Sequence, residues 1–334
     1  MREIRIAGAG PSGLAAAIVL ARNGLNVSVF EQNSCVGRRF NGDFQGIENW
    51  TSSDDFLEKL TSFGLEANFK HIPFHNFVLY NESFRSTQIK SEKPLVYLVK
   101  RGETSDTLDE GLLKQALAVG VKIKFNQKLH FDKADIIATG PQGRPDGVAK
   151  GITFDTDFPE FGCATLNQRL SPGGYTYFLS SGGSATLATV LLRDFPRASK
   201  CLEETVKEYE NFLGIKVPNK IRIWGGRGNY STPSTAIRSG KLLVGEAAGF
   251  QDKLFGFGIR FALTSGVLAA ISFIERKNYD DLWKQEFMRL MKVSRANRFI
   301  FANLPIARQL FWQIVGKSKN PRNMLGTLYS WQRI

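Results

Sequence analysis

The residues of this sequence best suited to chemistry lie near its start, where an apolar strand expected at 4–7 is followed by closely spaced glycines. In a strand–turn–helix unit the first glycine permits a tight turn, the second lets the backbone approach a pyrophosphate, and the third lets the helix lie close to the sheet. The helix also presents unpaired N–H groups and its positive dipole end to the phosphates. The spacing therefore predicts a dinucleotide site formed by Gly8, Ala9, Gly10, Pro11, Ser12 and Gly13.

An acidic residue follows the second expected strand, at 27–30, and is Glu31. At the tip of that strand a carboxylate can accept hydrogen bonds from both hydroxyls of an adenosine ribose. Its negative charge disfavours a 2′-phosphate. Glu31 therefore indicates FAD or NAD as the dinucleotide and disfavours NADP.

The composition is that of a globular protein, with 334 residues of which 43% are hydrophobic. The three cysteines, Cys35, Cys163 and Cys201, are widely separated and form no C-x-x-C pair. This pattern predicts neither a disulfide framework nor a metal site, and it fits a reducing cytoplasm.

The longest strongly apolar helix candidate, at 261–274, is shorter than the about 20 residues that a bilayer requires. We expect no transmembrane span.

The positive charge is concentrated near the C-terminus, where residues 276–334 have 12 Lys and Arg against 3 Asp and Glu. Helical spacing places Trp283, Phe287, Leu290, Met291 and Ser294 on one mostly apolar face and Arg289, Lys292 and Arg295 largely on another. Such a helix suits an anionic membrane surface. It also suits docking on the protein's own core with a solvated basic face. We do not expect nucleic acid as a partner.

The remaining patterns indicate two kinds of sheet. Strand and helix patterns alternate at 95–101, 109–117, 121–125 and 134–140, as in a parallel sheet with crossover helices. Short strands rich in Tyr, Phe, Thr and Gly follow between 152 and 192, and they indicate an antiparallel substrate layer. A strand at 242–245 then returns the chain to the first sheet.

Four segments together resemble a known family: the N-terminal fingerprint, Arg101 with Asp109-x-x-Leu112-x-x-x-Ala116, Ala138-Thr139-Gly140, and Gly245-Glu246-Ala247-Ala248-Gly249. They are similar to FAD-dependent oxidoreductases of the p-hydroxybenzoate hydroxylase superfamily, and within it to the geranylgeranyl reductase family. That family's segment Gly-Asp-Ala-Ala-Gly-Phe-x-Asp-Pro-x-x-Gly-Glu-Gly-Ile aligns with residues 245–259 without a gap. Its Pro-Gly-Gly-Tyr-x-Trp-x-Phe-Pro strand is echoed at 172–180.

The resemblance implies an α/β fold, in which a doubly wound, Rossmann-like FAD-binding domain is interleaved with an antiparallel-sheet substrate domain. We predict the FAD-binding domain at 1–45, 95–150 and 225–275, and the substrate domain at 46–94 and 151–224. A helical, basic C-terminal region is expected at 276–334.

The resemblance also implies contacts with FAD beyond the fingerprint. We expect them from Arg101, from one of the pair Arg38 and Arg39, and from Gly245, Glu246, Gly256, Phe257, Gly258 and Ile259. The helix that begins near Gly258 would direct its positive end at the flavin ring, where negative charge gathers on reduction. Tyr175 and Tyr177 share a strand face and are expected to line an apolar substrate channel, although core packing explains them equally well. No catalytic residue is assigned.

Several positions depart from the family pattern. Glu246 replaces an aspartate, which leaves cofactor binding intact. Lys253 replaces a proline, Phe257 a glutamate, Tyr177 a tryptophan and Ser180 a proline. We interpret these four as pocket positions, so the identity of the substrate cannot be carried over from the family.

Together these features predict an oxidoreductase that reduces carbon–carbon double bonds of an apolar, isoprenoid-like substrate with hydride from reduced FAD. Because the sequence has no second dinucleotide fingerprint, electrons are expected from a donor protein or from a transient NAD(P)H visit. The alternatives are a flavin-dependent monooxygenase or halogenase, and a non-catalytic FAD-binding protein. The expected location is the cytoplasm, with the basic C-terminal region leaving peripheral membrane contact open.

Overall fold

The computed structural model describes residues 2–229 and 232–330. The N-terminal unit forms as its sequence predicts, with β1 (Ile4–Ala7), α1 (Pro11–Arg22) and β2 (Val27–Phe30). Pro11 occupies the first turn of α1, where its missing N–H costs no hydrogen bond. β1 and β2 pair in parallel, with Ile4 opposite Val27.

A six-stranded sheet is built around β1, in the order β15-β16-β9-β1-β2-β8. Its other strands are β8 (Lys122–Lys124), β9 (Ile136–Ile137), β15 (Ile237–Arg238) and β16 (Lys241–Leu243). All neighbours pair in parallel except β15 with β16. The helices α1, α3 (Leu108–Ala118) and α5 (Ile259–Glu275) pack beside it, with α1 in contact with both others.

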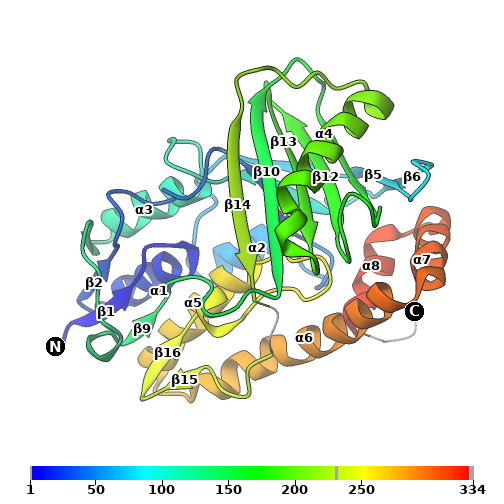
Figure 1. The fold of residues 1–334 in the computed structure, drawn as a ribbon. Helices are drawn as coiled ribbons and strands as arrows, with labels where there is room; N and C mark the ends of the chain where they lie inside the picture. Colours follow the sequence, from blue (N-terminus) through cyan, green and yellow to red (C-terminus); the bar gives the residue numbers. More distant parts are fainter. Residues whose placement is uncertain (1, 230–231, 331–334) are drawn as a thin grey trace.

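A seven-stranded sheet forms the second layer, in the order β14-β10-β13-β12-β11-β5-β6. Its strands are β5 (Asn76–Tyr80), β6 (Ser86–Lys90), β10 (Gly147–Asp155), β11 (Phe161–Thr165), β12 (Tyr175–Ser181), β13 (Ser184–Leu191) and β14 (Arg222–Gly228). Only β5 and β11 pair in parallel among the described strands of this sheet. The helix α4 (Ala198–Leu213) packs on it (Figure 1).

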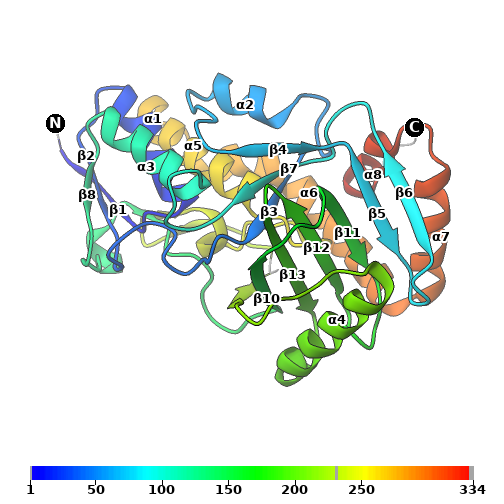
Figure 2. The same ribbon diagram turned by 90° about the horizontal axis from the view of Figure 1, so that it is seen from above.

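A three-stranded antiparallel sheet, in the order β3-β7-β4, lies between the two larger sheets (Figure 2). Its strands are β3 (Phe44–Glu48), β4 (His71–Phe74) and β7 (Val96–Lys100), and the helix α2 (Phe56–Ser62) follows β3. Short 3₁₀ turns occur at Phe131–Lys133, Phe195–Arg197 and Gly245–Ala248. The mixed α/β fold class is as expected. The exact domain boundaries stay a prediction.

Three helices end the described chain: α6 (Tyr279–Asn303), α7 (Pro305–Lys317) and α8 (Pro321–Ser330). Trp283, Phe287 and Met291 of α6 are almost fully buried. The rings of Trp283 and Phe287 lie 4.9 and 5.4 Å from that of Phe250. The apolar face of α6, which the sequence left open to either a membrane or the core, is therefore docked on the core. The prediction that this face inserts into a bilayer is wrong.

None of the helices that the structure describes combines the length and the hydrophobicity needed to cross a membrane.

Candidate functional site

One cavity of about 1100 Å³ connects the fingerprint of the six-stranded sheet with the inner side of the seven-stranded sheet. Gly8, Gly10 and Glu31 line one end, and Leu79, Tyr177 and other apolar or aromatic side chains line the far end. The cavity therefore joins a dinucleotide-type end to an apolar chamber without a partition.

The fingerprint glycines are required for different reasons. Gly8 has φ +102°, and a Cβ there would lie 2.4 Å from the carbonyl oxygen of Ala138. A Cβ on Gly13 would lie 2.1 Å from the carbonyl oxygen of Gly8. A Cβ on Gly10 would meet no heavy atom within 4 Å, because this position opens on the cavity. The residues present thus fit a pyrophosphate at Gly10.

The Glu31 carboxylate is held at the end of β2 by three donors. Oε2 accepts from the backbone N–H of Ala9 at 3.0 Å. Oε1 accepts from the backbone and side-chain nitrogens of Asn33 at 2.9 and 2.7 Å. These bonds fix the carboxylate at the cavity wall. Oε2 retains a lone pair for a ribose hydroxyl, whereas Asn33 occupies both lone-pair sites of Oε1. The bond to Oε2 also occupies the Ala9 N–H, which is then less available to a phosphate.

The two neighbouring arginines have different partners. Arg38 forms an exposed ion pair with Glu103, at 2.7 Å. Arg39 extends toward Glu246, with 3.7 Å between Nη2 and Oε2, and its guanidinium lies over the Phe40 ring. Of the pair, Arg39 is the one directed across the cavity at another predicted site residue.

Arg101 is buried and already strongly bound within the protein. Its guanidinium makes a bidentate pair with Asp109, with both N···O distances 2.8 Å, and donates to Gln45 at 3.1 Å. Burial opposes the charge, yet the Asp109 carboxylate leaves the pKa of Arg101 raised. Arg101 lines the cavity, so we expect it to supply fixed positive charge there.

The segment 245–259 forms the opposite wall of the cofactor end. Gly245 has φ +58°, and Glu246 lines the cavity with a pKa that burial raises and Arg39 lowers, for a net increase. Gly258 caps α5, whose N-terminus therefore faces the cavity. The Phe257 carbonyl accepts from the backbone N–H of Asp252 at 2.9 Å, which fixes the loop. The predicted residues of this segment thus come together with the fingerprint.

Phe257 lies at the junction with the apolar chamber. Its ring contacts Trp50 edge to face, with centroids 5.2 Å apart. A Cβ on Gly46 would lie 2.7 Å from the Phe257 ring, so this glycine admits the aromatic side chain. Both Phe257 and Tyr177 line the cavity, as predicted.

Two other predicted pocket positions lie elsewhere. Lys253 and Ser180 are not among the described residues that line the cavity. Lys253 is buried, and its Nζ donates to the carbonyl of Gly249 at 2.6 Å. Burial lowers the pKa of Lys253 to about 7. Ser180 donates to the carbonyl of Pro159. Lys253 and Ser180, which replace prolines of the family pattern, therefore do not contribute side chains to the wall of the chamber.

The chamber is walled by β12 and its neighbours. Tyr175 and Tyr177 project from one face of β12, and the Tyr175 hydroxyl donates to the carbonyl of Phe255. The Tyr177 hydroxyl has no hydrogen-bond partner among the described residues. Burial raises the pKa of Tyr177, so its hydroxyl keeps its proton at neutral pH. It can donate a hydrogen bond into an otherwise apolar chamber.

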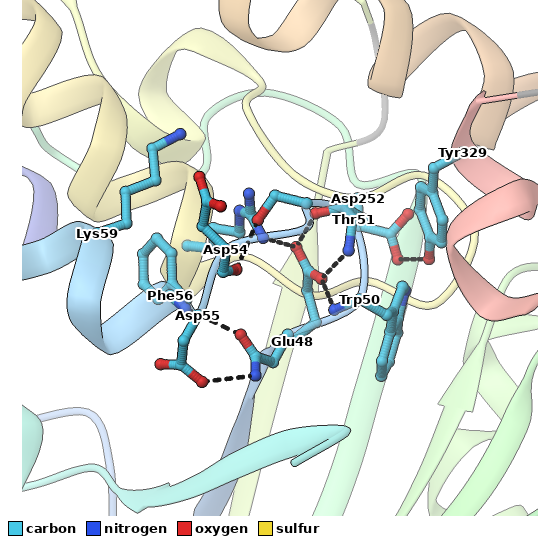
Figure 3. A network of polar contacts seen from close by, with 12 residues as sticks. Glu48, Trp50, Thr51, Asp54, Asp55, Phe56, Lys59, Asp252 and Tyr329 are labelled. Carbon is cyan, nitrogen blue, oxygen red and sulfur yellow. Dashed lines mark hydrogen bonds and ion pairs between the residues drawn. The ribbon is translucent and has the colours of Figure 1, made fainter. Parts of the chain in front are cut away.

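Sequence reasoning missed a buried polar network around Glu48 and Asp252 (Figure 3). Glu48 accepts from Thr51 Oγ1 at 2.7 Å and lies 3.3 Å from the guanidinium of Arg260. Asp252 accepts from the Tyr329 hydroxyl at 3.1 Å. Glu48, Arg260, Asp252 and Tyr329 come from β3, α5, the 251–257 loop and α8, so no local spacing connects these four. Asp252 could have been singled out, because it matches the aspartate of the family segment.

The described residues contain no group of three His, Cys, Asp or Glu side chains placed to hold a metal ion.

Comparisons with known proteins agree with this geometry. Residues 6–46 match the model of an NAD(P)-binding Rossmann-like domain. Digeranylgeranylglycerophospholipid reductase 2 of Methanosphaera stadtmanae is 26% identical over 309 residues, which cover 80% of this chain and 77% of the relative. The Methanopyrus kandleri protein of the same name is 23% identical, with 90% and 87% covered. Over most of its length the chain is thus similar to proteins named digeranylgeranylglycerophospholipid reductases.

Solved structures share the fold over nearly the whole chain. A geranylgeranyl bacteriochlorophyll reductase-like protein from Thermoplasma acidophilum superimposes with a TM-score of 0.78 at 18% identity, covering 98% of this chain and 96% of that one. A flavin-dependent brominase gives 0.69 at 14% identity, with 98% and 93% covered. The expected family resemblance, fold class and oxidoreductase class are confirmed, and the expected cofactor FAD agrees with the name of the flavin-dependent brominase. The roles of individual residues stay predictions.

Proposed function

We propose that this protein is an FAD-dependent reductase of carbon–carbon double bonds in an apolar, isoprenoid-like substrate. The observation that carries the proposal is the continuity of the cavity from the Gly10 backbone to the apolar chamber. A pocket with convergent polar groups at one end and apolar walls at the other suits a polar cofactor facing an apolar substrate. The names of the archaeal relatives support an isoprenoid lipid as the substrate class.

The residues at the cofactor end would bind and orient the dinucleotide. Gly10 would let the pyrophosphate approach the backbone, and Glu31 would accept from a ribose hydroxyl. Arg39, held near Glu246, is proposed as the arginine that reaches the phosphates, while Arg38 is occupied at the surface by Glu103. The N-terminus of α5 would favour negative charge at the ring.

The residues at the apolar end would exclude water and align the substrate. Bound reduced FAD would supply a hydride to one carbon of the double bond, and the other carbon would take a proton, which together add two hydrogens. Trp50, Phe257 and Leu79 form part of the wall against which an apolar chain would pack. The Tyr177 hydroxyl is proposed to hydrogen-bond to a polar group of the substrate, because a desolvated donor that has no partner among the described residues gains from such a contact.

The deciding experiment is anaerobic reoxidation of the reduced protein. The purified protein, loaded with FAD and reduced by dithionite, is mixed without oxygen with a geranylgeranyl lipid, and the flavin absorbance and the product mass are followed. Recovery of the oxidised-flavin absorbance, together with a product two hydrogens heavier than the added lipid, would support the proposal. Recovery only with oxygen, and with an oxygenated or halogenated product, would favour the monooxygenase or halogenase alternative. Recovery under neither condition would favour a non-catalytic flavoprotein.

A second experiment with the same FAD-loaded protein identifies the electron donor. NADH, NADPH and a small reduced iron–sulfur protein are each added to the oxidised protein without oxygen. The donor that bleaches the flavin band at a rate sufficient for turnover is the one we would assign. A flavin-free preparation serves as the control for direct reaction between donor and lipid.

A further inference from the structure

Large apolar side chains are exposed near the junction of α6 and α7. Phe299 is 71% exposed, Leu304 52%, Leu310 50%, Ile314 48% and Ile300 36%. The described part of the chain has only four other large apolar side chains of comparable exposure, and these are scattered over other elements. A cluster of this kind marks an interaction surface, whereas scattered exposed side chains do not.

The exposed side chains follow the outer faces of the two helices. On α6, Lys292, Arg295 and Phe299 recur at helical spacing, and with Met288 and Ile300 they line a shallow groove. On α7, Leu310, Ile314 and Lys317 recur in the same way. The opposite face of α7 is buried through Phe311 and Val315. We call the outer face the elbow surface, and it consists of Lys292, Arg295, Phe299, Ile300, Leu304, Leu310, Ile314 and Lys317.

The charge around the elbow surface has one sign. Residues 287–334 have nine Lys and Arg and no Asp or Glu. Lys292, Arg295 and Lys317 are exposed, and none of them forms an ion pair with another described residue. Exposed apolar side chains next to basic ones are the pattern of a helix that lies on an anionic membrane.

We propose that the elbow surface docks on an anionic lipid bilayer, with its apolar side chains inserted and its basic side chains at the headgroups. A second copy of the chain is a poor occupant, because a symmetric contact would bring like charges together without acidic partners. The proposed membrane contact is therefore the exposed face of α6. It is not the face that Trp283, Phe287 and Met291 bury against the core.

The elbow surface is also next to the chamber. Phe311, on the inner face of α7, lines the cavity and packs on Phe301, with centroids 5.1 Å apart. Figure 2 shows α7 at the edge of the molecule beside β6, far from the N-terminus. Docking here would bring one wall of the chamber to the lipid. Docking itself rests on the surface alone, whereas delivery of a lipid substrate by this route rests on the proposed function.

The test is sedimentation of the FAD-loaded protein with vesicles. One set contains equal parts of phosphatidylglycerol and phosphatidylcholine, and the other phosphatidylcholine alone. We expect binding to the anionic set, weakened by high salt. Lys292→Glu with Arg295→Glu should reduce the partition coefficient at least about tenfold. Phe299→Ser with Leu310→Ser should also reduce it, and the binding that remains should be removed by salt.

Matched controls carry the same chemical changes elsewhere. Lys200→Glu with Lys207→Glu reverses two exposed charges on α4, and Leu117→Ser with Ile223→Ser removes two exposed apolar side chains. Both controls should bind nearly as the wild type. Flavin content and circular dichroism verify that every variant is folded.

Three results would overturn the proposal. Equal loss in the controls and the elbow variants would show that only net charge matters. Binding to neither vesicle, or to both equally, would exclude an anionic bilayer as the occupant. A dimer in gel filtration that the Phe299→Ser with Leu310→Ser variant converts to a monomer would assign the surface to a second copy. Failure of the reductase assay would leave the vesicle result unaffected, so the two proposals can fail separately.

Discussion

The Tyr329 hydroxyl donates a hydrogen bond to Oδ2 of Asp252, at 3.1 Å, and so joins α8 to the loop that precedes α5. The same carboxylate accepts from the backbone N–H groups of Leu254 and Phe255, at 2.9 and 2.7 Å. Phe255 and Phe257 of this loop line the cavity. The last described helix therefore holds in place, through Asp252 (Figure 3), a loop that lines the cavity.

This contact should make the stability of the protein depend on pH. Burial raises the pKa of Asp252 to about 6, above its ordinary value of 3.8. Because the folded state then binds the proton more tightly than the unfolded state, the contribution of Asp252 to stability falls as pH rises from about 4 to about 6. The Tyr329 hydroxyl limits that loss, since it stabilises the ionised carboxylate. Burial raises the pKa of Tyr329 itself, so the hydroxyl stays protonated at pH 8.

Tyr329→Phe should therefore destabilise the protein more at pH 8 than at pH 5. We expect the free energy of unfolding to fall by about 1–2 kcal/mol at pH 8, where the carboxylate loses a donor, and by less at pH 5. Urea denaturation at the two pH values measures this difference. Tyr80→Phe, which changes a half-buried tyrosine on β5, is the control. An equal loss at both pH values would mean that the Asp252 charge is not what the hydroxyl stabilises.

Gly10→Val should give a folded protein without FAD. A Cβ at this position meets no protein atom, so the cost falls on the pyrophosphate site and not on the fold. Gly13→Val should instead impair folding, because its Cβ would overlap the carbonyl oxygen of Gly8. Flavin absorbance of the purified proteins and their thermal unfolding distinguish the two effects. A yellow Gly10→Val protein would contradict the proposed cofactor position.

The fingerprint was predictable from the sequence because its geometry is local. The turn at Gly8, the helix after it and the carboxylate at Glu31 all fall within one strand–helix–strand unit, where spacing alone determines the arrangement. The start of α2 is local in the same way, because Asp55 caps it with a side chain that accepts from the backbone N–H of Leu57.

The packing of α6, the buried polar network and the position of Lys253 could not be predicted, because they depend on contacts between distant segments. Helical periodicity identified the apolar face of α6, but it cannot say whether that face meets a bilayer or Phe250, because both are apolar. The partners Glu48 and Arg260 are separated by more than half the chain, and Tyr329 reaches Asp252 only after α6, α7 and α8 have folded back. Lys253 was wrongly expected in the pocket for the same reason, since sequence alone does not say which side of a loop a residue faces.

Glu31→Ala should weaken FAD binding by about 1–3 kcal/mol, through the loss of a charge-assisted bond to the ribose. The structure adds a second cost, because the variant also leaves the backbone N–H groups of Ala9 and Asn33 without their acceptor. Glu31→Gln separates the two effects, since it keeps an acceptor and removes the charge, and its loss should be smaller. Titration of the flavin-free proteins with FAD gives the affinities. Affinities unchanged in both variants would place the ribose elsewhere.

Phe257→Glu should lower the reduction potential of the bound flavin. It restores the family residue at the junction of the two ends of the cavity, where Phe257 contacts Trp50 and the open side of Gly46. A carboxylate there would add negative charge beside a ring that becomes electron-rich on reduction, so the reduced state would be destabilised relative to the oxidised state. Phe257→Gln, which has a similar shape without the charge, should leave the potential nearly unchanged. Equilibrium titration against dyes of known potential measures both variants, and equal potentials for Glu and Gln would show that residue 257 does not face the ring.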